Sequence, residues 1–144
     1  MALFLACSPV WDVWIEHGST LDRLVFGLAE ERRPLFTAPR PLTIDRVMVL
    51  TCEGGDTLWA VDYEPDRYRL QRDTGAGSWA KIAPRTRSDL PYGFEFGHGY
   101  LVLHAAEPLR PGVCYVGHVG SSPGNGYVEF RGRVDGKVIE LKTD

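Results

Sequence analysis

The sequence predicts an all-β protein, an antiparallel β-sandwich, with a small β-barrel as the alternative. Apolar residues alternate with polar ones at a period of two far more often than they recur at helical spacing. Turn signals rich in glycine and proline separate these short runs about every ten residues. The spacing does not fit strands that alternate with helices, so a parallel sheet is not expected.

The length of the chain sets the expected number of domains. Its 144 residues are the usual size of one domain, and folding at this size buries about 68% of the unfolded surface. We therefore expect a single β-sandwich domain over residues 9–144, preceded by residues 1–8 as the remnant of a signal or as a linker. No apolar run approaches the roughly 20 residues that a membrane-spanning helix needs.

The N-terminal half shows the predicted strands in order. Residues 10–16 alternate in polarity and are followed by the turn HGST, so they should form a hairpin with residues 21–28. Residues 30–42 contain three prolines, which lack a ladder donor, and should form an extended surface crossover. A central strand is expected at residues 43–52, and after the turn EGGD a returning strand at residues 57–63. At most one short helical turn is expected, near Ala29 to Arg33.

The C-terminal half predicts a similar series of short strands. Turn sequences such as DTGAG, SSPGNG and DG separate nearly all of them. The strands are expected at residues 67–71, 78–82, 99–105, 113–119, 126–134 and 137–141.

The segment LRPGVCY, residues 109–115, carries a family resemblance. Its L-x-P-G-x-x-Y arrangement resembles the corner that enters the penultimate strand of fibronectin type III and other immunoglobulin-like domains. The resemblance implies that the Tyr115 ring packs in the core while its hydroxyl bonds the corner backbone. It also implies that the segments on either side of the loop GSSPGNG are the last two strands, and that Trp59 could be the core tryptophan of the third strand.

Cys114 and His118 raise the question of a metal site or a nucleophilic pair. In a strand they share one face, with Tyr115 and Val119 on the other, and lie about 13 Å apart. That separation is too great for both to bind one zinc ion, or for one to activate the other. We therefore expect no catalytic residue, no metal site and no cofactor here.

The N-terminal segment MALFLAC resembles the end of a bacterial lipoprotein signal, which implies that Cys7 is lipidated. Such a signal would need a start upstream, because six residues are too few for its apolar core. On this reading Cys52 and Cys114 remain as an even pair that forms a disulfide in an oxidising compartment. The alternative is a cytosolic protein with three reduced, buried thiols.

The wider pattern is similar to that of small uncharacterised bacterial lipoproteins with one immunoglobulin-like domain. The apolar start that ends in Cys7 is followed by WDVWIEHGS, by LPYGFEFG and by PLRPGVCY. The resemblance implies a location outside the cytoplasm, in the periplasm or at the cell surface, and implies no particular activity.

An aromatic cluster is the candidate ligand-binding site. Tyr92, Phe94 and Phe96 lie two residues apart, so an extended backbone would line their rings along one face, with Trp79 nearby. An exposed row of this kind would bind a sugar face or a proline-rich peptide. The alternative is that one or more of these rings fill the core.

Charge and motifs narrow the expected function. The net charge is −3 and neither half of the chain is basic, so nucleic acid is not an expected partner. HExxH and phosphate-loop motifs are absent from the sequence. We expect a non-catalytic binding or structural module at a bacterial envelope, with a protein or polysaccharide partner. The alternatives are a cytosolic interaction domain, such as a toxin immunity protein, and a weak metal-dependent hydrolase.

Overall fold

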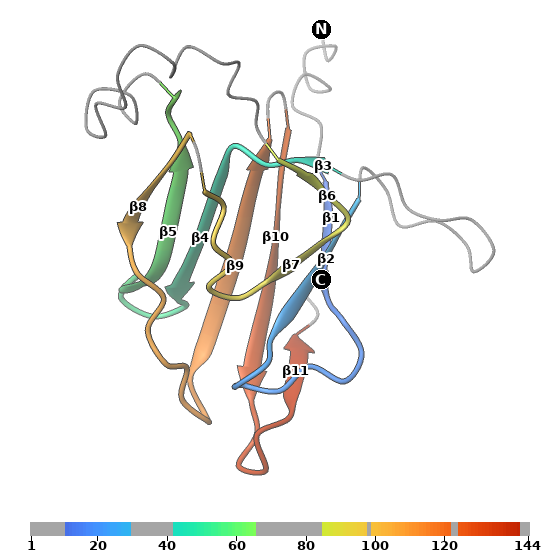
Figure 1. Cartoon of the computed structure of the whole chain (residues 1–144). Helices are drawn as coiled ribbons and strands as arrows, with labels where there is room; N and C mark the ends of the chain where they lie inside the picture. The colour runs from blue at the N-terminus through green and yellow to red at the C-terminus, as the bar shows by residue number, and fades with distance from the viewer. Residues whose placement is uncertain (1–10, 30–41, 66–84, 98, 122–123, 142–144) are drawn as a thin grey trace, which may run out of the picture.

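The computed structural model describes residues 11–29, 42–65, 85–97, 99–121 and 124–141, and these residues form an all-β architecture (Figure 1). The strands are β1 (Asp12–Ile15), β2 (Val25–Ala29), β3 (Leu42–Thr43), β4 (Arg46–Thr51), β5 (Thr57–Tyr63), β6 (Thr86–Arg87), β7 (Asp89–Pro91), β8 (Tyr100–His104), β9 (Cys114–Ser121), β10 (Gly124–Gly132) and β11 (Val138–Leu141).

Two antiparallel sheets make up the body of the domain. The larger has six strands in the order β11-β10-β9-β4-β5-β8, and the smaller has three in the order β1-β2-β7. A short ladder pairs β3 with β6. The small sheet lies across the β9–β10 side of the large sheet (Figure 1). The two sheets are separate and open at their edges, so the predicted antiparallel sandwich is confirmed and the closed small barrel is wrong.

Most predicted strands within the described residues are present. The first hairpin is confirmed, because β1 pairs with β2 in a register that sets Val13 opposite Leu28. The β5 strand has the predicted bounds, and β4 is shorter than residues 43–52. The strands predicted at residues 67–71 and 78–82, the helical turn and most of the crossover lie outside the described residues.

The small sheet contains one strand that the sequence analysis did not predict. β7 pairs with β2, and this register places Leu90 opposite Phe26 and Pro91 opposite Val25. A proline in a three-residue run argues against a strand unless it sits at an edge, and β7 is the edge of its sheet among the strands that the structure describes.

The core lies between the two sheets. Phe26 from the small sheet and Phe130 from the large sheet meet edge to face, with ring centroids 5.8 Å apart. Trp59 on β5 is only 2% exposed. The alternation predicted along the strands is visible in β10, where the buried residues are every second one. The other buried side chains of this cluster include Leu28, Val47, Val49, Val61, Leu90, Tyr115, Val119 and Val128.

The corner before β9 has the geometry that the L-x-P-G-x-x-Y segment implies. Tyr115 is 2% exposed, and its Oη accepts a hydrogen bond from the backbone N–H of Arg110 at 2.8 Å. Gly112 turns the chain at a φ of 81°, a left-handed conformation that glycine adopts without strain. The corner therefore fixes the entry of β9 into the centre of the large sheet.

Replacing Tyr115 with phenylalanine should test this corner. The ring still fills the core, but the Arg110 N–H loses its acceptor, so we expect the free energy of unfolding to fall by about 1 kcal/mol. Chemical denaturation of Tyr115→Phe measures the loss. The matched control is Tyr127→Phe, whose ring is half exposed on the neighbouring strand and should change stability by less than about 0.5 kcal/mol. Equal effects for the two variants would contradict a role for the corner hydrogen bond.

Candidate functional site

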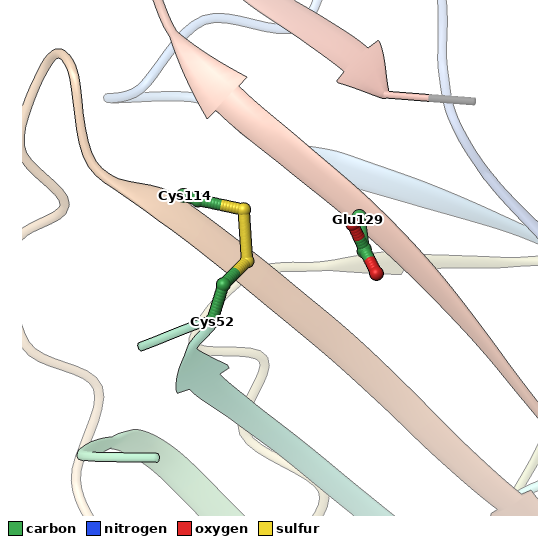
Figure 2. A group of neighbouring side chains, drawn as sticks. All are labelled: Cys52, Cys114 and Glu129. Carbon is green, nitrogen blue, oxygen red and sulfur yellow. A yellow bond between two sulfur atoms is a disulfide. The ribbon is translucent and has the colours of Figure 1, made fainter. Parts of the chain in front are cut away.

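A disulfide between Cys52 and Cys114 joins the end of β4 to the start of β9, as predicted (Figure 2). The two strands are direct neighbours, because Thr51 pairs with Tyr115. The backbone N–H of Cys52 donates a hydrogen bond to the Cys114 carbonyl at 2.9 Å. The Cα atoms are 5.3 Å apart. Backbone pairing therefore holds the two cysteines side by side.

The position of this bridge differs from that of antibody domains. There the disulfide crosses the core from one sheet to the other. Here both cysteines belong to the large sheet, and they lie on its outer face because the next residue, Tyr115, points into the core. Cys52 is exposed and Cys114 is partly buried. The sulfur of Cys52 is therefore accessible to small molecules, and this bridge can undergo thiol–disulfide exchange.

Glu129 on β10 completes a cluster with the two cysteines. One carboxylate oxygen and the two Sγ atoms all lie within 4.8 Å of one another. Figure 2 shows Glu129 beside the disulfide, on the strand next to Cys114. The side chain is partly buried, and among the described residues it makes no hydrogen bond or ion pair. Two sulfurs and one carboxylate are a ligand set that suits zinc once the sulfurs are thiolates.

Sequence reasoning missed Glu129 because its closeness to Cys114 depends on the register between two strands. β9 and β10 pair with Val128 opposite Gly117, so Glu129 lies diagonally across from Cys114 on the same face. The available signal was the alternation in YVEF, which directs Val128 and Phe130 inward and Tyr127 and Glu129 outward.

His118 lies on the same outer face of β9 but is not part of this cluster. Tyr115 and Val119 are both buried, which confirms the predicted division of β9 into two faces. The His118 ring stacks on Tyr127, with centroids 6.0 Å apart and planes 18° from parallel. Burial lowers the pKa of His118 below its ordinary value, and the positive charge of Arg46 lowers it further.

The lowered pKa of His118 predicts a stability that depends on pH. Well above pH 6.5 the side chain is neutral in both the folded and the unfolded state, and it contributes no pH dependence. Below pH 6.5 the unfolded chain takes up the proton more readily, so stability falls as the pH drops toward the folded-state pKa. Denaturation midpoints measured from pH 8 to pH 5 should fall more steeply for the wild type than for His118→Gln. Parallel curves would contradict the prediction.

The predicted aromatic row is not formed. Gly93 has a φ of 81°, so the chain turns after Tyr92 and does not run extended. The Tyr92 ring packs edge-on against Trp59 at 5.3 Å, and its hydroxyl donates to the Glu107 carbonyl at 2.6 Å. Burial raises the pKa of Tyr92 to about 12. Through this hydrogen bond to Glu107, Tyr92 stabilises the loop before the Tyr115 corner.

The other two rings of the predicted row belong to a separate aromatic cluster. Phe96 is 3% exposed and stacks on Tyr100 at a centroid distance of 4.5 Å. Phe94 packs edge-on against Phe96 at 4.9 Å and is covered by the Arg87 guanidinium at 4.2 Å. Phe96 thus fills the core, the alternative that the sequence left open. A ligand-binding role for this region stays a prediction, because Trp79 lies outside the described residues.

Tyr100 was not among the predicted site residues, and its role is structural. Its hydroxyl donates to the Ile44 carbonyl at 2.6 Å and accepts from the Arg85 N–H at 2.7 Å. Burial raises the pKa of Tyr100 to about 12. These two hydrogen bonds therefore link the start of β8 to the segments before β4 and β6.

The turn EGGD, which the sequence predicts between β4 and β5, is held by the side chain of Thr51. In the acidic turn after β4, Thr51 Oγ1 accepts from the Asp56 N–H at 2.9 Å and donates to the Glu53 carbonyl at 2.7 Å. The turn is therefore closed by its own hydrogen bonds. The predicted lipidation site, Cys7, lies outside the described residues.

Within the described part of the chain, no helix has the length and apolar character needed to cross a membrane. Comparison of the chain with protein-family models, with curated proteins and with solved structures finds no match.

Proposed function

We propose that this chain is a non-catalytic binding or structural module that works outside the cytoplasm, at a bacterial envelope. The observation that carries the proposal is the Cys52–Cys114 disulfide. Disulfides persist in secreted and periplasmic proteins, whereas cytosolic glutathione and thioredoxin keep thiols reduced. The exposed position of Cys52 strengthens the argument, because an accessible bridge is open to attack by cytosolic thiols.

The proposal includes an immunoglobulin-like or fibronectin type III-like fold. In that family strands A, B and E share one sheet, while C′, C, F and G share the other. The orders β1-β2-β7 and β5-β4-β9-β10 match this arrangement, and the tyrosine corner precedes the strand that corresponds to F. Two strands depart from the pattern: β8 extends the sheet beyond β5, and β11 extends it beyond β10.

A binding role is supported by exposed apolar side chains on the large sheet. Among the strands that the structure describes, β8 is an edge strand that pairs with β5 alone, and its Val102 and Leu103 are 64% and 54% exposed. Natural edge strands usually carry charged residues or proline to prevent pairing with other chains. β8 contains no proline, lysine, arginine, aspartate or glutamate, and its one titratable imidazole, His104, pairs with Glu107 at the end of the strand. An edge with two exposed apolar side chains is suited to a protein partner.

Trapping the thiols in cells tests the proposed compartment. Cells that express the full chain from its own gene are quenched in acid, alkylated without reductant and fractionated before intact-mass analysis. We expect Cys52 and Cys114 to remain unalkylated, because they are bonded to each other. We expect the protein to be absent from the cytoplasmic fraction. Alkylated Cys52 and Cys114 in the cytoplasmic fraction would contradict the proposal and favour a cytosolic interaction protein, such as an immunity protein.

The proposed lipid anchor is tested in the same cells. Cys7→Ser should move the protein from the membrane fraction to the soluble fraction, because lipidation at Cys7 supplies the anchor. Cys52→Ser/Cys114→Ser is the control: it removes both other cysteines and their disulfide without touching the anchor, and should leave the membrane association unchanged. A Cys7→Ser protein that remains in the membrane fraction would rule out the anchor.

A further inference from the structure

The cluster of Cys52, Cys114 and Glu129 brings three metal-ligating side chains together from separate parts of the chain. Cys52 follows β4, Cys114 begins β9 and Glu129 lies in β10. These three strands are consecutive in the large sheet, in the order β10-β9-β4. Ladder hydrogen bonds therefore hold the three Cα positions whether or not the sulfurs are bonded to each other.

The spacing of the ligand atoms fits a single tetrahedral ion. Zinc binds thiolates at about 2.3 Å and carboxylate oxygens at about 2.0–2.2 Å, so two sulfurs bound to one ion lie about 3.8 Å apart and each lies about 3.5 Å from the oxygen. The three ligand atoms are already within 4.8 Å of one another. Once the S–S bond is broken, rotation of the two cysteine side chains about Cα–Cβ supplies the remaining movement, with the Cα atoms still 5.3 Å apart.

The environment of Glu129 also supports a cation site. A partly buried carboxylate normally makes an ion pair or accepts hydrogen bonds, but within the described residues Glu129 does neither. One of its oxygens instead lies within 4.8 Å of both sulfurs, beside the disulfide (Figure 2). A cation held between the thiolates and the carboxylate would give Glu129 the partner that it lacks.

We propose that reduction of the Cys52–Cys114 disulfide creates a binding site for a thiophilic divalent cation such as Zn²⁺. The ligands are the Cys52 and Cys114 thiolates and the Glu129 carboxylate, and the exposed side of Cys52 leaves a fourth position for water. In the oxidised protein neither Cys52 nor Cys114 is a thiolate, so this site does not bind the ion. The cluster thus has two states, a covalent cross-link when oxidised and a metal site when reduced, and both join β4 to β9.

The reduction is a two-electron exchange with a dithiol. The dithiol supplies two electrons and two protons, the Cys52–Cys114 bond breaks, two protein thiols form and the reductant closes into its own cyclic disulfide. Binding of the cation then displaces the two thiol protons, so affinity rises with pH. This step concerns the reduced protein and goes beyond the proposed envelope function.

Titration with Co²⁺ tests the site, because thiolate ligands give cobalt a characteristic sulfur-to-metal charge-transfer absorption. The full chain carries Cys7→Ser to remove the third thiol, is reduced with a dithiol and is desalted without oxygen. We expect one equivalent of Co²⁺ to bind with this absorption and Zn²⁺ to displace it. Oxidised protein, and protein that also carries Cys52→Ser and Cys114→Ser, should give no such signal.

Glu129→Gln tests the third ligand without touching the cysteines. We expect it to weaken Co²⁺ binding by about tenfold or more, while Glu95→Gln, an exposed glutamate elsewhere in the chain, binds as the parent does. Near-ultraviolet circular dichroism follows the fold of the reduced protein before and after Co²⁺ is added. Recovery of a native spectrum on addition of Co²⁺ would support the site.

Three results would overturn the proposal: no charge-transfer absorption in the reduced protein, equal binding by oxidised protein, or Glu129→Gln binding as tightly as the parent. A reduced chain that is unfolded and stays unfolded with Co²⁺ would overturn it as well. None of these results bears on the thiol state or the location of the protein in cells. The envelope proposal is therefore tested separately, by alkylation and fractionation.

Discussion

Loss of the Cys52–Cys114 disulfide is expected to lower the free energy of unfolding by about 4 kcal/mol. The bridge closes a loop between residues that are 62 positions apart, and opening that loop increases the conformational entropy of the unfolded chain. The folded state loses little packing, because Cys52 is exposed and Cys114 lies on the outer face of the sheet. Denaturation of Cys52→Ser/Cys114→Ser without reductant, compared with the wild type, measures the effect.

Two controls separate the bridge from other effects of these substitutions. Cys7→Ser removes a cysteine outside the bridge and should unfold at the same denaturant concentration as the wild type. Wild-type protein in excess reductant should match the double variant. A double variant within about 1 kcal/mol of the oxidised wild type would contradict a stabilising disulfide at this position.

Gly126→Ala is expected to destabilise the fold by about 3 kcal/mol, near the upper end of the range for overpacked sites. A methyl group at Gly126 would lie 2.3 Å from the Trp11 carbonyl oxygen and 2.9 Å from Val13 Cγ2. The backbone cannot move aside freely, because the Trp11 N–H donates a hydrogen bond to the Asn125 carbonyl at 2.8 Å. The extra methyl group therefore forces β1 away from β10, and thermal or chemical denaturation should show the loss.

The matched control for this prediction is Gly120→Ala on the adjacent strand. There the nearest atom to an added methyl group is Arg46 Cβ at 3.5 Å, an ordinary contact. We expect no loss of stability and a gain of up to about 1 kcal/mol, because alanine restricts the unfolded chain more than glycine does. If Gly126→Ala were as stable as Gly120→Ala, the packing of β1 against β10 would be wrong.

The parts of the fold that local sequence determines were predictable. Alternation along β9 and along β10 comes from one face packing on a core, and that pattern is visible within a few residues. The Tyr115 corner was predictable because proline and glycine set its turn chemistry within a seven-residue motif. β7 was not predictable in this way, since its pairing with β2 depends on a distant strand and it carries Pro91.

The same distinction applies to the candidate site. Pairing of Cys52 with Cys114 followed from setting Cys7 aside as a lipidation site, which left two cysteines. Glu129 could be found only from the register between β9 and β10. The aromatic row failed because the left-handed conformation of Gly93 reverses the chain between Tyr92 and Phe94, and a glycine in a sequence does not reveal which φ it adopts.

Peptide mapping under acidic, non-reducing conditions tests most directly the claim that a disulfide between β4 and β9 stabilises this sandwich. The full chain, expressed in an oxidising compartment, is digested and analysed by mass spectrometry before and after reduction. We predict one linked peptide pair, containing Cys52 and Cys114, that separates on reduction, with Cys7 outside it. Free thiols at Cys52 and Cys114, or a bridge from either of them to Cys7, would contradict the account.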